Sequence, residues 1–219
     1  MKQSQHYLFR RYLRYWSEDG EHVYRYEKST KQTKRLPIKV VGAANNQWSC
    51  EIENPIFSNF EGQYPAIIKA LESREKITDQ INNYLIDLMS VFYSRVPKQK
   101  RNMKRISSEL LKSTPTMREL DQGMIAQIVA HNQVLKNMGS KAVILIAKND
   151  KTFITTDNPA PATFLHLPLT PRLLMITPNK NVILRYVDAD EFFVGMINKK
   201  NVEMADKYIF SLERQHSDI

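Results

Sequence analysis

A histidine and two arginines near the start of the chain have the types and the spacing for acid–base chemistry on a phosphate. His6, Arg10 and Arg14 lie four residues apart, so on a helix their side chains form one stripe. Neighbouring positive charges lower the pKa of a histidine and keep its ring neutral. A neutral ring can remove the 2′-hydroxyl proton of RNA while an arginine holds the phosphate. The favoured alternative is a histidine that only caps or hydrogen-bonds the helix, because a lone histidine fixes no mechanism.

A second group of polar residues follows an apolar segment as Thr155-Thr156-Asp157-Asn158-Pro159. At the end of a strand, Asp157 can serve as a catalytic carboxylate or as a metal ligand. The favoured alternative is a structural turn, in which the side chains of Asp157 and Asn158 bind backbone amides before Pro159. No zinc motif and no glycine-rich phosphate loop is visible, so we expect neither a metal nor a cofactor.

A basic segment, KQKRNMKR, occupies residues 98–105. The whole chain has a formal net charge of +9, and residues 1–112 contribute 20 Lys and Arg against 12 Asp and Glu. This asymmetry indicates an acidic partner, most simply nucleic acid, and the alternative is a solvated surface that aids solubility. We predict nucleic acid, with RNA favoured, as the partner. The expected phosphate contacts are Arg10, Arg14, Lys98, Lys100, Arg101, Lys104 and Arg105.

The periodicity of the apolar residues predicts the elements that must position these groups in the first two thirds of the chain. Thr78 or Asp79 is expected to open the second long helix, Pro97 to end or kink it, and Gly139 to close the last one. The expected elements are a helix over 6–16, two paired strands within 22–41, and helices over 64–71, 77–92, 106–111 and 117–138.

The last third of the chain is expected to begin with strands. The segment 142–177 has short apolar runs separated by turns at 149–150 and 157–159, which predicts an antiparallel meander. Asp188 followed by Glu191 predicts a capping box that opens a C-terminal helix, with a break at 198–201 before 202–210. Five side chains of the meander should be buried: Val143, Leu145, Phe153, Leu167 and Leu174.

These elements predict one α+β domain over residues 1–219. A helical middle, about 60–138, should pack on an antiparallel sheet formed by strands from about 22–41 and 142–187, followed by the C-terminal helix. The apolar fraction of 42% is ample for a core, and the longest apolar run, Ala142–Ala147, is far too short to span a membrane. Cys50 is the only cysteine, so no internal disulfide can form. We therefore expect a cytoplasmic protein without membrane contact, and the oligomeric state stays open.

Several short motifs, taken in order, resemble one family. His6-Tyr7, followed by Tyr12-Leu13-Arg14 and Trp16, resembles the HYxPxxYLxxF opening of the domain-of-unknown-function family numbered 4238, with Phe9 in place of the proline. Arg95-x-Pro97 is similar to its R-x-P pair. Residues 155–159 are similar to its T-S-D-N-P corner, with threonine in place of serine, and Leu167-Pro168-Leu169-Thr170-Pro171 contains its P-L-T-P motif.

This resemblance implies no established fold, activity or cofactor, but it marks the positions to weigh. His6, Arg95 and Asp157 become the candidate catalytic residues, and Asn158 and Pro159 the structural turn. Because distant motifs that share a function usually meet in space, we expect the helix starting at His6 to pack across the strand end that carries Asp157, with both side chains lining one pocket.

Two functions follow from these residues. The first is a nucleic-acid-directed enzyme, such as a metal-independent ribonuclease or a toxin-like host-defence effector. The alternative is a non-catalytic module that binds nucleic acid or protein, in which the same residues hold the fold together.

Overall fold

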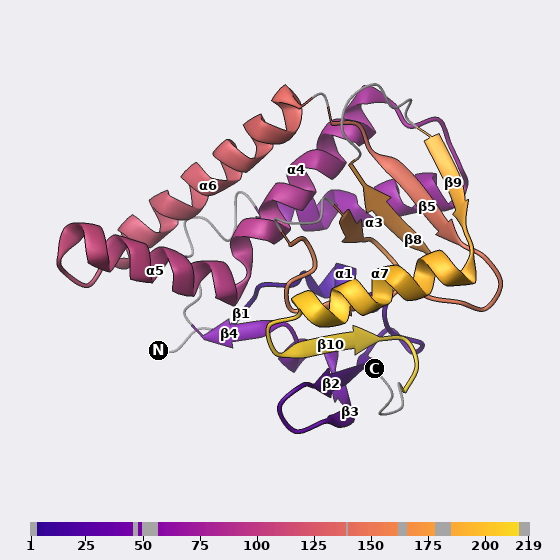
Figure 1. Ribbon diagram of the computed structural model, residues 1–219, viewed down its shortest axis with the longest axis horizontal. Coiled ribbons are helices and arrows are strands. Elements are labelled where there is room, and N and C mark those ends of the chain that lie inside the picture. Colours follow the sequence, from indigo (N-terminus) through magenta and orange to yellow (C-terminus); the bar gives the residue numbers. More distant parts are fainter. Residues whose placement is uncertain are drawn as a thin grey trace.

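The computed structural model describes residues 4–45, 48–49, 57–138, 140–161, 166–177 and 185–214. The α+β class is confirmed, with a helical middle between two groups of strands. Figure 1 shows the helices over 79–137 at the upper left, one sheet at the right and another sheet at the bottom. The expected cap at Gly139 lies outside the described residues. No helix in the described ranges has the length and apolarity needed to cross a bilayer.

Two of the long helices begin at a threonine that caps them. The hydroxyl of Thr78 accepts a hydrogen bond from the Ile81 backbone N–H, and Thr116 forms a capping box with Glu119. Pro97 ends one helix and opens the next, because proline fits the first helical position but not the interior. The helices are α1 (Arg10–Arg14), α3 (Ser58–Glu72), α4 (Asp79–Arg95), α5 (Pro97–Leu111), α6 (Met117–Asn137) and α7 (Glu191–Met204), with a 3₁₀ turn, η1 (Ile38–Val40).

The strands in the described ranges form three sheets instead of the one expected. β1 (Ser4–His6) pairs with β4 (Ala43–Asn45). The lower sheet in Figure 1 is antiparallel and has the order β3 (Gln32–Pro37), β2 (His22–Glu27), β10 (Tyr208–Ser211) and β6 (Thr155–Thr156). The right-hand sheet has the order β7 (His166–Pro168), β8 (Leu173–Ile176), β5 (Val143–Ala147) and β9 (Arg185–Ala189), with β5 and β9 parallel.

The expected meander over 142–177 is therefore only partly correct. β5, β8 and β7 are neighbours in one antiparallel arrangement, but β6 leaves them and pairs with β10 in the lower sheet. The physical reason is that β10 offers a free edge, since its other edge already pairs with β2. The burial expected for the apolar side chains of this segment is confirmed, with at most 5% of each exposed: Val143, Leu145, Phe153, Leu167 and Leu174.

Two further expectations about the C-terminal helix are wrong. The N-cap of α7 is Asp190, whose carboxylate accepts from the Phe193 backbone N–H at 2.8 Å, while the Asp188 carboxylate forms ion pairs with Arg74 and Lys148. The helix also continues through 198–201. It ends at Met204, and residues 208–211 form β10.

The helix expected over 6–16 is shorter than predicted. His6 lies in β1, and the Tyr7 and Leu8 backbone N–H groups both donate to the Gly42 carbonyl, so the first turn begins only at Arg10. Tyr12 and Leu13 on α1 are fully buried and fix this short helix to the core.

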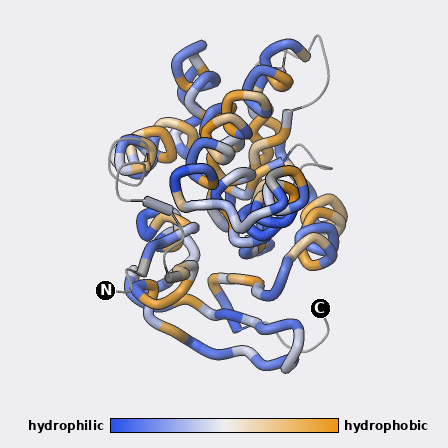
Figure 2. Tube along the Cα trace, turned by 90° about the vertical axis from the view of Figure 1, so that its left-hand side faces the viewer, coloured by the Kyte–Doolittle hydropathy of each residue, from blue (hydrophilic) through white to orange (hydrophobic). Residues whose placement is uncertain are grey.

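The main core lies between α1, α3 and α4 and the right-hand sheet. The central helix α4 is exposed in its polar first turns and buried on several faces from Tyr84 onward, where most of its side chains are apolar. Figure 2 shows apolar stretches where the helices face one another and hydrophilic residues in the outer turns, including the β2–β3 hairpin at the bottom. A smaller cluster beneath α7 contains Tyr26, Ile154, Ala205 and Ile209.

Candidate functional site

His6 is half-buried on β1, and its ring contacts two other segments. Its Nε2 atom lies 3.3 Å from the Ile38 carbonyl oxygen and 3.4 Å from Nε of Arg10. A single ring nitrogen donates to the carbonyl or accepts from the arginine, according to its tautomer. Burial, followed by the Arg10 charge, lowers the pKa of His6. The direction agrees with a ring that stays neutral at pH 7.

Arg95 ends α4 and lies inside the protein. Its side chain is among the largest that are fully buried, and its guanidinium stacks over Phe57 at 3.9 Å and over Phe9 at 5.0 Å from the ring centres. Its charge also contributes to the lowered pKa of His6. Two aromatic rings against the guanidinium are typical of cation–π packing in a core.

Asp157 binds the connection between α7 and β10. Its Oδ1 accepts from the Asp206 backbone N–H at 2.9 Å, and its Oδ2 accepts from the N–H groups of Lys207 and Tyr208 at 2.8 and 3.1 Å. Burial raises the pKa of Asp157 to about 6, although the three amides act in the opposite direction. Both carboxylate oxygens therefore hold backbone, which is the geometry of the structural alternative.

The residues next to Asp157 complete this corner. The Asn158 side-chain amide donates to the Met204 carbonyl at 3.1 Å, and its backbone N–H donates to Oγ1 of Thr156. Pro159 is buried. The Thr155–Pro159 corner thus attaches the end of α7 to the lower sheet.

The N-terminal motif and this corner do meet, but through tyrosines. The Tyr12 hydroxyl lies 2.5 Å from Oγ1 of Thr155 and donates to the Pro168 carbonyl at 2.8 Å, so α1 packs across the strand end as expected. Tyr7 is buried near Asp157, whose charge adds to the effect of burial in raising the pKa of Tyr7. Within the described ranges no hydrogen bond or ion pair joins His6 to Asp157.

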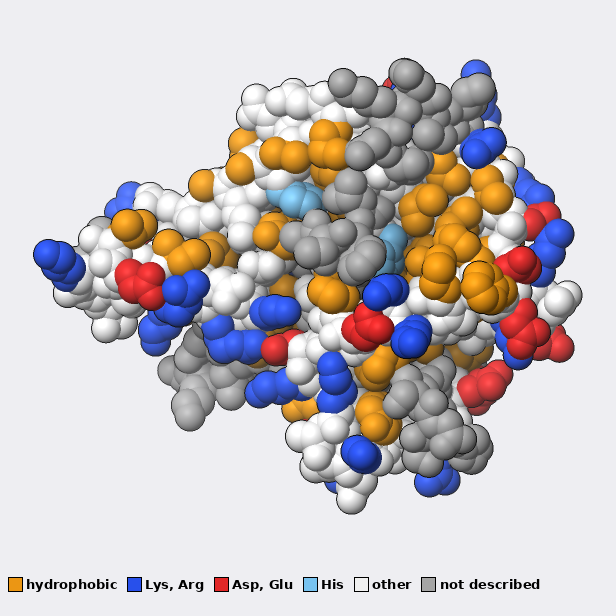
Figure 3. Space-filling model, in the orientation of Figure 1, with side chains coloured by type: hydrophobic (Ala, Val, Ile, Leu, Met, Phe, Trp, Pro, Cys, Tyr) orange, Lys and Arg blue, Asp and Glu red, His pale blue; other side chains and the backbone are white. Residues whose placement is uncertain are grey.

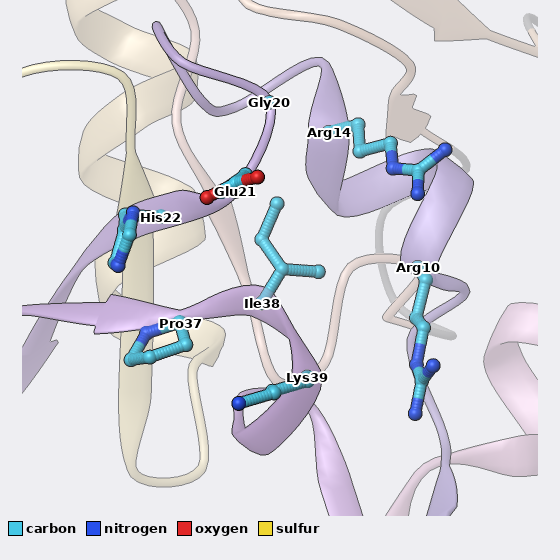
Figure 4. Close-up of a pocket in the computed structure, with 8 residues that line it drawn as sticks. All are labelled: Arg10, Arg14, Gly20, Glu21, His22, Pro37, Ile38 and Lys39. Atoms are coloured by element: carbon cyan, nitrogen blue, oxygen red, sulfur yellow. The ribbon is translucent and has the colours of Figure 1, made fainter.

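A pocket of about 340 Å³ opens beside α1, and it is lined by basic residues. Figure 4 shows Arg10 and Arg14 on α1 along one side and the 37–39 segment along another, with the turn of Gly20 and Glu21 closing the third side. Neither His6 nor Asp157 lines it, although His6 touches the pocket residues Arg10 and Ile38. The described residues that line it are Arg10, Arg14, Gly20, Glu21, His22, Pro37, Ile38 and Lys39.

The cations of this pocket have no acidic partner among the described residues. Within the described part of the chain, no ion pair joins Arg10, Arg14 or Lys39 to a carboxylate. Asp19 lies in the adjoining turn, but it binds the His22 ring at 2.9 Å and Arg35 at 2.5 Å. Backbone hydrogen bonds from Glu21 and His22 hold the pKa of Asp19 well below its usual range. The described lining of the pocket therefore has three cations and one carboxylate, Glu21.

The predicted basic segment lies on α5, where some of its charge is already compensated. Arg101 pairs with Asp206 at 2.5 Å and Arg105 pairs with Glu109 at 2.9 Å. Lys100 packs over the Trp48 ring at 5.0 Å, and burial lowers its pKa. Lys104 is exposed and Lys98 half-exposed. Figure 3 shows lysine and arginine side chains gathered along this side of the molecule and continuing toward the lower sheet.

Sequence reasoning found two of the pocket cations but missed the third. Arg10 and Arg14 were expected to contact phosphate because of their helical spacing, whereas Lys39 lies in a segment expected to be a strand. The turn η1 places Lys39 opposite α1, and no local pattern indicates that approach. Among the described residues, no group of three or more His, Cys, Asp and Glu side chains could hold a metal ion.

Comparison with known proteins identifies a family, but it finds no matching curated protein or solved structure. A family model described as a protein of unknown function, DUF4238, matches residues 4–215. That range begins at β1 and ends just after β10, so it includes the pocket, the Asp157 corner and the three sheets of the described structure. The chain therefore belongs to the DUF4238 family of proteins of unknown function.

Proposed function

We propose that the protein binds nucleic acid, with RNA favoured, through the cations of α1, η1 and α5. The observation that carries this proposal is the lack of acidic partners around Arg10, Arg14 and Lys39 in the described structure. Placing like charges four residues apart on a helix is unfavourable in the free protein, and a bound polyanion offsets that repulsion. The lone cysteine fits a cytoplasmic location, which we propose for the same protein.

The geometry supports a binding role better than catalysis by the three candidate residues. Both oxygens of Asp157 hold backbone amides, and Arg95 is only 2% exposed. A catalytic group must reach a substrate, so these two side chains are better suited to holding the fold together.

The experiment is a salt titration of binding to labelled single-stranded RNA and DNA. Neutralising phosphates releases counterions, so the logarithm of the binding constant should fall linearly with the logarithm of the salt concentration. The same titration should be run on a Lys98→Gln/Lys104→Gln variant, because neither lysine forms an ion pair in the described structure. Each lost contact should reduce the slope by about 0.7 to 0.9.

The matched control removes two charges from the other end of the molecule. Lys148 pairs with Asp188 and Lys151 pairs with Glu191, near the end of β5. A Lys148→Gln/Lys151→Gln variant should keep the wild-type slope. If both variants had the same salt-dependence slope, the α5 lysines would contribute to binding only through the net charge of the protein. Absence of salt-dependent binding by the wild type would refute the proposed function.

A second function, cleavage of the bound RNA, is favoured by one observation. His6 has a lowered pKa and lies 3.4 Å from Arg10 at the edge of the basic pocket, which suits a general base beside a phosphate contact. If this role is real, His6→Ala should abolish cleavage of labelled RNA and leave the melting temperature almost unchanged. Intact RNA after incubation with the wild-type protein, with and without EDTA, would exclude cleavage of that substrate.

A further inference from the structure

We propose that the pocket between α1 and η1 binds a phosphomonoester, and that its source is the terminal phosphate of a nucleic acid. This inference rests on the proposed function, because it names the part of the nucleic acid that the pocket takes. It concerns Arg10, Arg14 and Lys39, and it is separate from the α5 surface, which would contact internal phosphates along the strand.

The charge around the pocket sets the class of ligand. Among the described lining residues, three cations and one carboxylate, Glu21, leave an excess of positive charge around a cavity of about 340 Å³. A phosphodiester carries one negative charge, whereas a phosphomonoester carries about 1.5 to 2 at pH 7 and offers three acceptor oxygens. Three cations around one small cavity are therefore better matched by the monoester.

The arginines in the pocket also differ from four others of the chain. Arg35, Arg74, Arg101 and Arg105 each have a carboxylate oxygen within 2.9 Å, whereas Arg10 and Arg14 have none among the described residues. The nearby Asp19 carboxylate does not compensate them, because His22, Arg35 and two backbone N–H groups bind it. The guanidinium groups thus keep donors for an external anion.

The three cations come from two elements that line the same cavity. Arg10 and Arg14 are exposed on one stripe of α1, which the buried Tyr12 and Leu13 fix to the core. Figure 4 shows Lys39 on the turn across the pocket, with its side chain directed away from α1, so cations from two separate elements line the cavity but their charged ends lie apart. Arginine presents a planar pair of donors that fits two phosphate oxygens, and lysine adds a point charge.

The remaining walls leave room for more than a phosphate. Ile38 points into the space between the two elements in Figure 4, and Pro37 adds a second apolar side chain. Small-ligand pockets begin at about 300 Å³, so the cavity can take a phosphate with part of its sugar. An apolar wall beside an anion site favours such a ligand over a bare phosphate ion.

The test compares RNAs that differ only at the terminus. Labelled 12-nucleotide RNAs of one sequence, with a 5′-phosphate, a 3′-phosphate or neither, are titrated by fluorescence anisotropy. We expect one phosphorylated end to bind about tenfold more tightly than the unphosphorylated RNA, as hydrogen bonds to charged groups allow. Arg14→Gln and Lys39→Gln should each remove most of this preference. Arg14→Lys, which keeps the charge and loses the planar donor pair, should remove part of it.

The control is Lys34→Gln, which removes one exposed charge from β3 outside the pocket. It should keep the preference for the phosphorylated end. Arg14 and Lys39 are exposed, so their variants should melt at the wild-type temperature, and this is checked before each titration. Loss of preference in the Lys34 variant to the same extent would overturn the assignment to the pocket.

A calorimetric titration with a nucleoside monophosphate, with the nucleoside and with inorganic phosphate separates the two sources of a phosphomonoester. Binding of the monophosphate without any RNA binding would refute the proposed function. It would also refute the terminal phosphate of a nucleic acid as the source, and the ligand of the pocket would then be a free nucleotide. RNA binding that is indifferent to both terminal phosphates would overturn this inference and leave the proposed function standing.

Discussion

Asp157 shows how one side chain can join parts of the chain that are about fifty residues apart. Its two oxygens satisfy three successive backbone N–H groups at Asp206, Lys207 and Tyr208, where α7 gives way to β10. Its own backbone N–H donates to the Tyr208 carbonyl at 3.0 Å. A carboxylate can accept all three side-chain hydrogen bonds at once, which explains why this turn uses an aspartate.

Replacing Asp157 with asparagine should lower the free energy of unfolding. The amide keeps one acceptor oxygen, but its NH2 group faces N–H donors, so at least one buried donor loses its partner. The expected loss is about 1–3 kcal/mol. Urea denaturation measures it, with Asp150→Asn in an exposed turn as the control that should stay near wild type. An unchanged free energy of unfolding, together with lost cleavage of RNA, would instead support the catalytic role.

At the scale of elements, long periodic segments were predictable and short ones were not. The patterns over 64–71, 77–92 and 117–138 correspond to α3, α4 and α6, and the Thr78 cap is confirmed. These helices bury continuous apolar faces, so the periodicity of their own sequence is sufficient to predict them. β6 has two residues and β10 has four, and each is defined by its partner strand, which no local pattern reveals.

Two asparagines in α7 illustrate the same limit. Their weak helix propensity predicted a break, but the helix continues and their side chains bind the segment before β6. Asn198 accepts from the Ile154 N–H at 3.0 Å and donates to the Thr152 carbonyl at 2.8 Å. Asn201 donates to the Ile154 carbonyl at 3.0 Å. They take the place of a neighbouring strand along this segment.

Asn198→Ala should therefore destabilise the protein although alanine is the better helix former. The gain in helix propensity is about 0.5–0.7 kcal/mol, whereas an unpaired buried backbone group costs about 1–3 kcal/mol. The net free energy of unfolding should fall, as measured by urea denaturation. The control is Lys199→Ala, at an exposed position of the same helix, and its free energy of unfolding should not fall. A more stable Asn198→Ala protein would show that the two side-chain hydrogen bonds contribute little.

At the scale of the whole molecule, the last strand completes a sheet begun near the start of the chain. β10 lies between β2 and β6, so the N-terminal hairpin, the Asp157 corner and the C-terminal strand form one unit. The sequence predicted the α+β class and that α1 packs on the corner, because both depend on apolar patterns and on motifs. It did not predict the basic pocket as a site, because Lys39 reaches α1 only through the tertiary fold.

Three histidines in different parts of the molecule should make its stability depend on pH. Burial lowers the pKa of His6, His131 and His166 below the ordinary value of 6.5. As the pH falls through 6.5, the unfolded chain takes up protons that the folded protein does not, so the free energy of unfolding decreases. Asp157 acts in the opposite direction, because its pKa of about 6 lies above the ordinary 3.8, and its contribution grows as the pH falls through 6.

We expect the three histidines to outweigh the one aspartate, so that the protein is less stable at pH 5.5 than at pH 7.5. Urea denaturation at the two pH values measures the difference. His131→Phe keeps an aromatic ring beside Tyr93, which stacks on His131 at 4.5 Å between ring centres, but it cannot take up a proton. This variant should lose part of the pH dependence, even though Ser90 loses the His131 ring as a hydrogen-bond partner at both pH values. Asp157→Asn removes the opposing contribution. Its free energy of unfolding should therefore fall more between pH 7.5 and pH 5.5 than that of the wild type. A wild-type protein that is equally stable or more stable at pH 5.5 would contradict this balance and indicate that Asp157 dominates.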